Sequence, residues 1–505
     1  MGDKMIIKVK FLDISTEAMA LINPEDAVKI GGKDNDRVRI DGRKSAIALL
    51  NVSDFVSKGE IVLSICLKNK VQASDGDELN IVYASSPESV RSIRKKMDKE
   101  KLSKEEIHAI VTDILENRLS KIEISAWLTA LYINGMDIEE IADFTEAMVE
   151  TGDRVEFDRS PVYDFHSMGG VPGNKITPIV VSIVAAAGLM LPKTSSRAIS
   201  SACGTSDFVE TFCDVEMDAA TLKKISEETG GVLAWGGAMN LAPVDDLVIK
   251  VEHPLGVNPR AQMLASILSK KLAIGATHLV IDIPTGTGTK VPTIEVARAY
   301  ARDFMDLGDK LNLHIECAIT YADQPVGNAI GPKLEARECI RILEGEKHPS
   351  SVIEKACDLA GIILEMGGFP NGNEKAREIL DSGAAMKKFR EIVAAQKGNY
   401  DISSNDLVPG EFVADIVSAK SGYVHTISNK ELVAIAVAAG SPSDKGAGIL
   451  LMKKKGQRVE KGDTLFQIYG DSKAKVDRAK ELAAKYKPFD IEGMLLKRIT
   501  APRTR

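Results

Sequence analysis

Between residues 162 and 308, apolar strand-like runs twice end in a glycine-rich loop that leads directly into a helical pattern. The run VYDFHSMGGVPGNK precedes ITPIVVSIVAAAGL, and HLVIDIPTGTGTK precedes PTIEVARAYARDFMDLG. Alternation of strand and helix is typical of an α/β domain with a largely parallel sheet. In such a sheet, ligands bind at the carboxyl ends of the strands. The two loops therefore mark the place where a functional site is expected.

The segments around this region predict three further domains. Residues 1–84 indicate a β domain, because runs such as DRVRIDG, EIVLSICLK and DELNIVYA alternate with turn residues. Residues 87–160 predict a helical domain, in which Ser103 and Glu106 form a capping box before an amphipathic helix. Residues 161–415 form the α/β domain, whose sheet we expect to be mixed but largely parallel. Residues 416–505 predict a β-rich α+β domain with an embedded helix.

Composition argues against several classes of protein. The chain carries 65 Lys+Arg against 72 Asp+Glu, so we expect no general binding to nucleic acid or to an anionic membrane. It contains no uncharged apolar run of the length, about 18 residues, that spans a bilayer. The start MGDKMIIKVKFLD does not resemble a secretory signal. The six cysteines form no close pairs and the seven histidines show no HExxH spacing. We therefore expect reduced thiols in a cytoplasmic protein and no metal site.

Three loops carry residues suited to holding an anion. In His166–Lys175 the glycines allow successive backbone amides to point at one spot, beside the positive end of the following helix. Its spacing is not that of a Walker A loop, so ATP hydrolysis is not indicated. The loop Thr194–Asp207 offers hydroxyls and the planar guanidinium of Arg197. The loop Ile283–Lys290 brings Lys290 within reach of an anion.

Each of these features also has an ordinary structural interpretation. Glycine-rich turns and βα turns often bind nothing, and Ser206 or Asp207 can cap the helix after the second loop. Ser266 and Lys270 share one face of a helix, as they would on any exposed helix. Three such loops in one domain nevertheless favour a substrate with more than one phosphate-like group.

Four motifs, in this order along the chain, resemble the pyrimidine and thymidine phosphorylase family. They are Ser167 with Gly169–Gly170, the loop from Ser195 to Thr205, the helix ASILSKKLA, and the tail AVAAGSPSDKGAGILLMKKKGQRVEKGDTLFQIY. This similarity covers about residues 87–505. The additional β domain, HSMGGVPGNK and SSRAISS look instead like the archaeal AMP phosphorylase branch of that family.

The resemblance implies an enzyme, a pentosyltransferase of nucleotide salvage and AMP catabolism. It would split AMP, and also CMP and UMP, with inorganic phosphate into free base and ribose 1,5-bisphosphate. Phosphate is then a co-substrate, and no cofactor is expected. The resemblance also implies a homo-oligomer, a dimer or larger, with the β domain as the candidate oligomerisation device. Residues 243–273 would join the helical domain, which in thymidine-phosphorylase-like proteins closes with the α/β domain over the substrates.

The same resemblance implies roles for individual residues. Ser167, Ser195 and Thr205 match positions that hold the attacking phosphate. The positions that correspond to nucleotide contacts are Gly170, Ser196, Arg197, Ala198, Ile199, Ser200, Ser201, Thr205, Ser266 and Lys290. Lys270 matches a lysine that contacts the base in the nucleoside enzymes.

Two residues depart from the family pattern. The family's proton donor is an aspartate eight residues before the helix serine, and this chain has Asn258 there, in HPLGVNPRAQM. An amide donates a hydrogen bond but gives up no proton. Asn258 is therefore either a neutral catalytic donor, or a turn residue before Pro259 while another group supplies the proton. Phe165 stands where nucleoside phosphorylases have a lysine, which argues against a simple nucleoside phosphorylase.

Two alternatives remain open on the sequence. One is a phosphorylase of thymidine or uridine that needs no 5′-phosphate. The other is a carrier or assembly module, because VEKGDTLFQI resembles biotinyl- and lipoyl-carrier barrels, with Lys473 near the position of their modified lysine. The Met-Lys-Met context of those carriers is missing.

Overall fold

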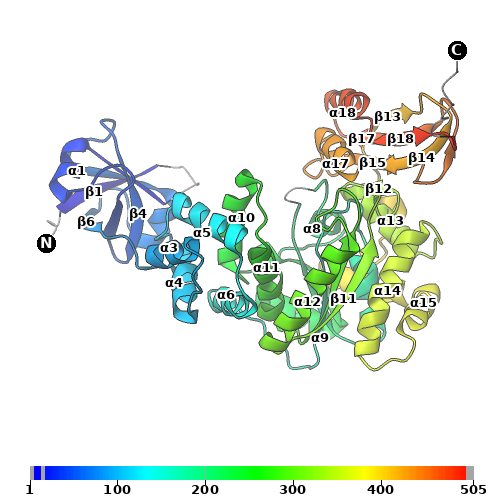
Figure 1. The fold of residues 1–505 in the computed structure, drawn as a ribbon, viewed down its shortest axis with the longest axis horizontal. Helices are drawn as coiled ribbons and strands as arrows, with labels where there is room; N and C mark the ends of the chain where they lie inside the picture. Colours follow the sequence, from blue (N-terminus) through cyan, green and yellow to red (C-terminus); the bar gives the residue numbers. More distant parts are fainter. Residues whose placement is uncertain (1–4, 13–17, 199–200, 496–505) are drawn as a thin grey trace, which may run out of the picture. The chain divides into compact units, whose positions relative to one another are not determined.

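The computed structural model describes residues 5–12, 18–198 and 201–495 (Figure 1). The chain divides into two compact units. The first combines Met1–Gly152 with Ala242–Ser269, and the second combines Asp153–Leu241 with Lys270–Arg505.

The first unit begins with a closed β-barrel. Its strands are β1 (Met5–Leu12), β2 (Met19–Ile22), β3 (Arg37–Asp41), β4 (Ser45–Val52), β5 (Glu60–Ser64) and β6 (Glu78–Ala84). They close in the order β1-β5-β2-β4-β3-β6. Alternate residues such as Ile7 and Val9 fill the interior, because successive strand side chains point to opposite faces. The predicted N-terminal β domain is confirmed.

Two short helices of the barrel were not expected from the sequence. They are α1 (Pro24–Ile30) and α2 (Ile65–Val71). The run EIVLSICLK, predicted as one strand, leaves the sheet after Ser64, and its second half is helical. This prediction was wrong because a short apolar run fits a strand and a buried helix equally well. The helix buries Leu67 and Val71 among the residues of the barrel core.

Six helices make up the rest of the first unit, with α11 continuing into the second. They are α3 (Ser89–Met97), α4 (Lys104–Leu115), α5 (Lys121–Asn134), α6 (Ile138–Glu150), α10 (Pro243–Leu255) and α11 (Arg260–Ala273). The capping box of Ser103 and Glu106 is present as predicted. In the core, the Trp127 and Phe144 rings meet edge to face with 5.9 Å between centroids.

Parallel strands form the centre of the second unit. One sheet has the order β11 (His314–Tyr321), β10 (His278–Thr285) and β7 (Tyr163–Ser167). A parallel pair, β8 (Leu191–Ser195) and β9 (Gly231–Trp235), lies beside β7, since Tyr163 N donates to Met190 O. β10 runs parallel to β7 and β11, and β8 runs parallel to β9. β8 runs beside β7 in the same direction, because Tyr163 lies next to Met190 and Asp164 next to Lys193, so the ends of β7, β8 and β10 lie on one side. The predicted α/β class is confirmed.

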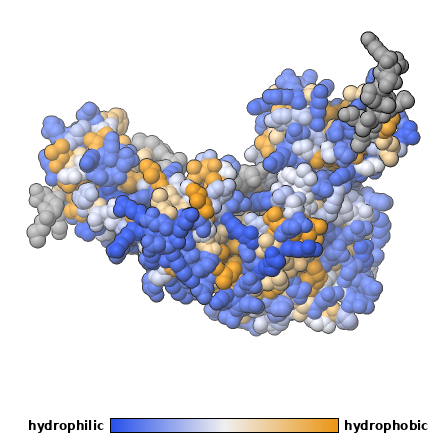
Figure 2. All heavy atoms as spheres, in the orientation of Figure 1, coloured by the Kyte–Doolittle hydropathy of each residue, from blue (hydrophilic) through white to orange (hydrophobic). Residues whose placement is uncertain are grey.

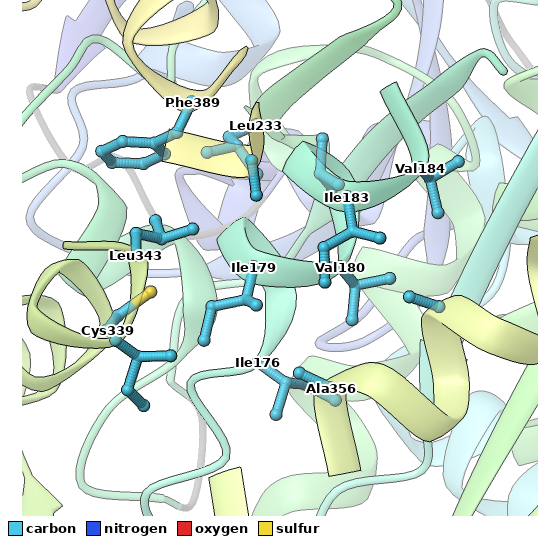
Figure 3. Close-up of a cluster of buried hydrophobic side chains, with 14 of the residues drawn as sticks. Ile176, Ile179, Val180, Ile183, Val184, Leu233, Cys339, Leu343, Ala356 and Phe389 are labelled. Atoms are coloured by element: carbon cyan, nitrogen blue, oxygen red, sulfur yellow. The ribbon is translucent and has the colours of Figure 1, made fainter. Parts of the chain in front are cut away.

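The helix after the first loop, α7 (Thr177–Ala186), is the centre of the core. Apart from Thr177 and Ser182 its residues are apolar, and all of them except Ala186 are buried. Figure 3 shows side chains from this segment among residues of later elements: Ile176, Ile179, Val180, Ile183 and Val184 with Leu233, Cys339, Leu343, Ala356 and Phe389. The last five belong to β9, α13 (Pro332–Leu343), α14 (Ser350–Met366) and α16 (Ala384–Ala395). A helix held this way fixes the loop that precedes it.

Four further helices of this unit complete the α/β part. They are α8 (Thr205–Val209), α9 (Ala219–Thr229), α12 (Ile294–Leu311) and α15 (Gly372–Asp381). Short 3₁₀ turns lie at Gly236–Ala238 and Ser404–Asp406.

The C-terminal part of the chain is β-rich, as expected. Strands β12 (Ala329–Ile330), β15 (Gly448–Leu451), β17 (Thr464–Gly470) and β13 (Phe412–Val417) form one antiparallel sheet. Strands β16 (Arg458–Val459), β14 (Gly422–Ile427) and β18 (Phe489–Glu492) form another. The embedded helix is α17 (Asn429–Ala438), and α18 (Lys473–Tyr486) follows β17 along the chain.

The face shown in Figure 2 is mainly hydrophilic, with apolar patches between the charged side chains. Among the helices of the described residues, none is long and apolar enough to cross a membrane.

Candidate active site

The first loop starts where β7 ends. Ser167 is the last residue of β7, and its hydroxyl accepts a hydrogen bond of 3.0 Å from Asn174 Nδ2. Met168 N donates to Asp282 O in the neighbouring strand β10. Gly169 and Gly170 both adopt positive φ angles, +77° and +86°, which side chains rarely tolerate. The loop therefore folds back on itself and holds Ser167 at the sheet edge.

The first and third loops meet at Gly170. A Cβ atom there would lie 2.9 Å from Lys290 N and 3.3 Å from Lys290 Cγ, so only glycine allows this approach. One hydrogen bond within the third loop holds its shape, because Thr289 Oγ1 donates to Gly286 O at 2.8 Å. A second one ties the loop to the segment after β11, since Thr287 N donates to Asp323 Oδ1 at 2.6 Å. The structure thus brings together two residues that the resemblance assigns to nucleotide binding, Gly170 and Lys290.

The second loop begins at Ser195, the last residue of β8, and returns to it. Ser206 Oγ donates to Ser195 O at 3.2 Å. Asp207 Oδ2 accepts from Ala198 N at 2.7 Å and from Gly204 N at 2.9 Å. Asp207 is the third residue of α8 and holds Gly204, the N-cap of that helix, which is a structural role of the kind that the sequence allowed. A Cβ on Gly204 would lie only 2.6 Å from Ala198 N.

The remaining residues predicted for this loop have different outcomes. Ser196 O accepts a hydrogen bond from Ser206 N, and Ser201 Oγ donates to Cys203 O at 3.2 Å. Thr205 is the first residue of α8. Ile199 and Ser200 lie outside the described residues. For all of them, a contact with nucleotide or phosphate stays a prediction.

Arg197 is occupied by carboxylates. Its guanidinium binds Glu210 through two bonds of 2.9 and 2.6 Å, reaches Glu216 at 3.0 Å, and lies over the Trp235 ring at 4.6 Å. Hydrogen bonding to Arg197, helped by Lys445, lowers the pKa of Glu210 to about 2. The sequence suggested that the guanidinium of Arg197 binds an oxyanion of a ligand. In the structure it binds a carboxylate of the protein instead. To bind a nucleotide phosphate, Arg197 has to exchange this partner.

Beneath the loops lies a buried basic cluster that the sequence analysis did not identify. Asp164 in β7 is fully buried, and its carboxylate is 2.6 Å from Lys271 Nζ and 3.6 Å from Lys193 Nζ. Lys193 Nζ also donates to Thr194 O at 2.7 Å and lies over the ring of Phe165. Two lysines thus share one aspartate.

Lysine charges also act on His166, the residue before Ser167. Burial, and then the charges of the lysines 271, 193, 270 and 290, hold the pKa of His166 well below its ordinary value. Below the loops, the ammonium groups of Lys193 and Lys271 face a single carboxylate, that of Asp164, so formal positive charge exceeds negative charge in this cluster, which suits an anionic ligand nearby. The only sequence sign of the cluster was a pair of charged residues, Asp164 and Lys193, inside otherwise apolar strand runs.

Asn258 and Ser266 belong to the first unit. Ser266 Oγ donates to Asp245 Oδ2 at 2.8 Å, and Gln262 Nε2 donates to Asp245 Oδ1 at 3.0 Å. Asp245 is fully buried in α10 and was missed by the sequence analysis. Asn258 is exposed just before Pro259 and α11, and its amide contacts Met263 Sδ at 3.7 Å. Lys270 follows Ser266 by four residues on α11, as predicted, and is assigned to the second unit.

Metal ligands do not gather anywhere in the described residues: no group of three or more His, Cys, Asp or Glu side chains is placed to hold an ion.

Three family models match the chain. Residues 90–152 match the helical bundle domain of a glycosyl transferase family, and residues 159–386 match the a/b domain of that family. Residues 423–489 match the C-terminal domain of pyrimidine nucleoside phosphorylases. Anthranilate phosphoribosyltransferase from Thermus thermophilus shares the fold, with a TM-score of 0.52 and 22% identity over 61% of this chain and 99% of that one.

Proteins similar over nearly the whole length are AMP phosphorylases. That of Thermococcus kodakarensis is 49% identical over 98% of this chain and 99% of its own. Those of Methanococcoides burtonii and Pyrococcus abyssi are 47% and 51% identical over 98% and 97% of this chain, and 99% of their own. The chain belongs to this glycosyl transferase family, in its AMP phosphorylase branch, and the resemblance seen in the sequence is confirmed.

Proposed function

We propose that the protein is a pentosyltransferase that cleaves AMP with inorganic phosphate to adenine and ribose 1,5-bisphosphate. CMP and UMP are further substrates in this proposal. The observation that carries it is the convergence of three loops, ending β7, β8 and β10, at an edge of the sheet surrounded by lysines. Two anions, the attacking phosphate and the 5′-phosphate, have to be held in this reaction, and the names of the full-length relatives agree with it.

The reaction needs a phosphate held in place more than it needs a reactive side chain. Breaking an N-glycosidic bond builds positive charge on the ribose in an oxocarbenium-like transition state. A phosphate dianion bound near C1 stabilises that charge and then attacks. In the proposal Ser167, Ser195 and Thr205 hold this phosphate. Fixing both reactants in one site removes part of the entropic barrier, about 7–11 kcal/mol at the limit.

All three loops hold the nucleotide in this proposal. Gly170 of the first loop and Lys290 of the third already lie against each other, and we assign the 5′-phosphate to their backbones. Asn258 is the candidate hydrogen-bond donor to the departing base, with Ser266 and Lys270 as further contacts. Because an amide does not release a proton, Asn258 supplies weaker assistance than the aspartate of relatives would, where a general acid contributes about 10²–10⁴-fold.

The remaining parts of the proposal follow from the chemistry. The transfer is not a redox reaction and forms no carbanion that a cofactor would have to stabilise, so no cofactor is needed. Inorganic phosphate is the co-substrate. We place the enzyme in the cytoplasm, where nucleotide salvage draws on AMP. We also propose that it works as a homo-oligomer, a dimer or larger, with the barrel of β1–β6 as the assembly element.

The test is chromatographic detection of free base from AMP, CMP, UMP and their nucleosides, with and without phosphate. We expect 5′-monophosphates to react far better than nucleosides, and no base release without phosphate. If adenosine or uridine matched its nucleotide in kcat/KM, the protein would be a nucleoside phosphorylase. Base release at an unchanged rate without phosphate would make it a hydrolase.

A further inference from the structure

The buried cluster of Asp164, Lys193 and Lys271 is placed directly below the loops. Lys193 and Asp164 are 4% and 0% exposed, and Lys271 is 2% exposed. Lys193 lies on β8 two residues before Ser195, so both side chains leave the strand on the same face. Asp164 lies on β7 three residues before Ser167. The cluster therefore underlies the two strand ends that carry the predicted phosphate ligands.

The charges of this cluster do not cancel. The Asp164 carboxylate is 2.6 Å from Lys271 Nζ and 3.6 Å from Lys193 Nζ, so its ion pair with Lys271 is the stronger one. The hydrogen bond of 2.7 Å that the Lys193 ammonium donates goes to a neutral group, the carbonyl oxygen of Thr194, and the ring of Phe165 beside it is neutral as well. A buried ammonium without a full counterion is costly unless an anion arrives nearby. The loops directly above are where that anion is expected.

We propose that Lys193 is a positioning residue for inorganic phosphate: it stays largely neutral in the empty site and takes up a proton from solvent when the anion binds above it. The proposal rests on the proposed function for the identity of the anion. It assigns no contact between Lys193 and the substrate, because its ammonium acts on the loops through charge. The proton comes from the buffer and is returned when the product leaves.

The environment of Lys193 supports this linkage. Burial, with the charge of Lys271 added, lowers the pKa of Lys193 to about 7, and Asp164 opposes the shift. His166 of β7 is the next titratable group, and the lysines 270 and 290 also act on it. Helix α7 and strand β9, which pack beside β8, have no titratable side chain. On α9, Lys223 pairs with Asp158 and Glu227 away from the cluster.

The sign of the pH dependence follows. An anion stabilises the charged form of Lys193 and raises its pKa in the complex. Anion affinity is then greatest below pH 7 and falls as the pH rises from about 7 towards the pKa of the complex. Phosphate itself titrates in this range, so sulfate, whose charge is constant there, is the suitable probe.

The experiment measures the sulfate dissociation constant of the full chain between pH 6 and 9. Sulfate protection against thermal unfolding, relative to chloride at equal ionic strength, gives this constant without any turnover. For the wild type we expect the constant to rise on the order of tenfold across the range, since one pKa unit of coupling is a factor of ten in binding. A constant that does not change with pH overturns the proposal even without a variant.

Two substitutions and one matched control identify the titrating group. Lys193→Met should bind sulfate weakly at every pH, and Lys193→Arg, which stays charged, should bind tightly at every pH. The control is Lys96→Met, because Lys96 is equally buried at 4% and pairs with Glu140 at 2.8 Å on the helices of the first unit. It should lower stability and leave the pH profile of wild type. The variants are needed because burial also brings the pKa of Lys454 and of Glu335 to about 7.

Kinetics then separate this inference from the proposed function. In Lys193→Met we expect the KM for phosphate to rise on the order of tenfold at pH 6.5, with a smaller change in the KM for AMP. If wild type releases base from AMP while Lys193→Met keeps both the phosphate KM and the sulfate pH profile, the inference is wrong and the function stands. If wild type shows no phosphorolysis, the function is wrong, and the sulfate experiment still decides the role of Lys193.

Discussion

Replacing Gly170 by alanine tests whether the contact between the first and third loops matters for nucleotide binding. Gly170 has a φ angle of +86°, so a Cβ atom costs about 1–2 kcal/mol in backbone strain. The same atom would meet Lys290 N at 2.9 Å, 0.5 Å closer than the 3.4 Å at which ordinary contact begins. Because the neighbour is backbone, the loop with Lys290 has to move by about that amount.

The functional effect can be separated from the strain. A misplacement of 1 Å costs about 10²-fold in rate, so half of it corresponds to about tenfold. Gly169→Ala and Gly188→Ala are the controls, because both glycines have positive φ, +77° and +89°, with nothing within 4 Å of the added atom. All three variants should lose stability through the shared backbone strain, and Gly170→Ala should lose more because its Cβ also meets Lys290 N. Gly170→Ala alone should lower kcat/KM for AMP by about a further tenfold.

The assay is initial-rate release of adenine at varied AMP and saturating phosphate, with each variant checked for unfolding. Equal kcat/KM in Gly170→Ala and Gly169→Ala, with both variants folded in the assay, would refute the reasoning. The approach of the loops at Gly170 would then be a packing feature with no part in holding the nucleotide.

Three other changes test the site. If Arg197 leaves Glu210 to grip the nucleotide, Arg197→Ala should raise the KM for AMP about 10- to 150-fold and the phosphate KM less; lost stability with unchanged AMP kinetics would leave it a structural residue. Glu210 has a pKa of about 2 in the folded chain against an ordinary 4.5, so its stabilisation is complete above pH 4.5 and lost as the pH falls towards 2. The difference in unfolding free energy between wild type and Glu210→Gln should therefore shrink from pH 6 to pH 3, and a constant difference would contradict this. Asn258→Asp should raise kcat for AMP. It should also give a pH profile of kcat in which activity falls as the new carboxyl group loses its proton. If Asn258→Asp and Asn258→Ala both leave kcat and its pH dependence unchanged, Asn258 is a turn residue.

Local rules predicted the parts of the fold that depend on neighbours in sequence. The capping box of Ser103 and Glu106 was readable because its two residues lie three positions apart in the sequence. The loops at the ends of β7 and β10 followed from apolar runs that change into helical spacing, and the parallel sheet brings such ends to one edge. The glycine at position 170 indicated a turn, but its contact with Lys290 could not be predicted.

Interactions between distant residues were beyond the sequence. Arg197 was predicted to face an anion because its fork suits one, yet Glu210 and Glu216 supply carboxylates at 2.6–3.0 Å. Nothing in the spacing distinguishes a substrate oxyanion from a carboxylate of the chain, since both satisfy the same donors. Ser266 was assigned to nucleotide binding by the family resemblance, and the buried Asp245 that accepts its hydrogen bond lies on another helix, so no local pattern revealed this partner.

The location of positive charge bears on Phe165, which by the sequence resemblance stands where the nucleoside phosphorylases have a lysine. A phosphate at the end of β7 needs a cation nearby, but the cation need not belong to β7. Lys193 on the neighbouring strand places its ammonium 5.1 Å from the centre of the Phe165 ring, which screens it from solvent and attracts it through its π face. A lysine at 165 would add a further ammonium to a cluster where Lys193 and Lys271 already share Asp164. An aromatic ring fills this position without that repulsion, which is consistent with our proposal that the charge for the phosphate comes from Lys193 on β8.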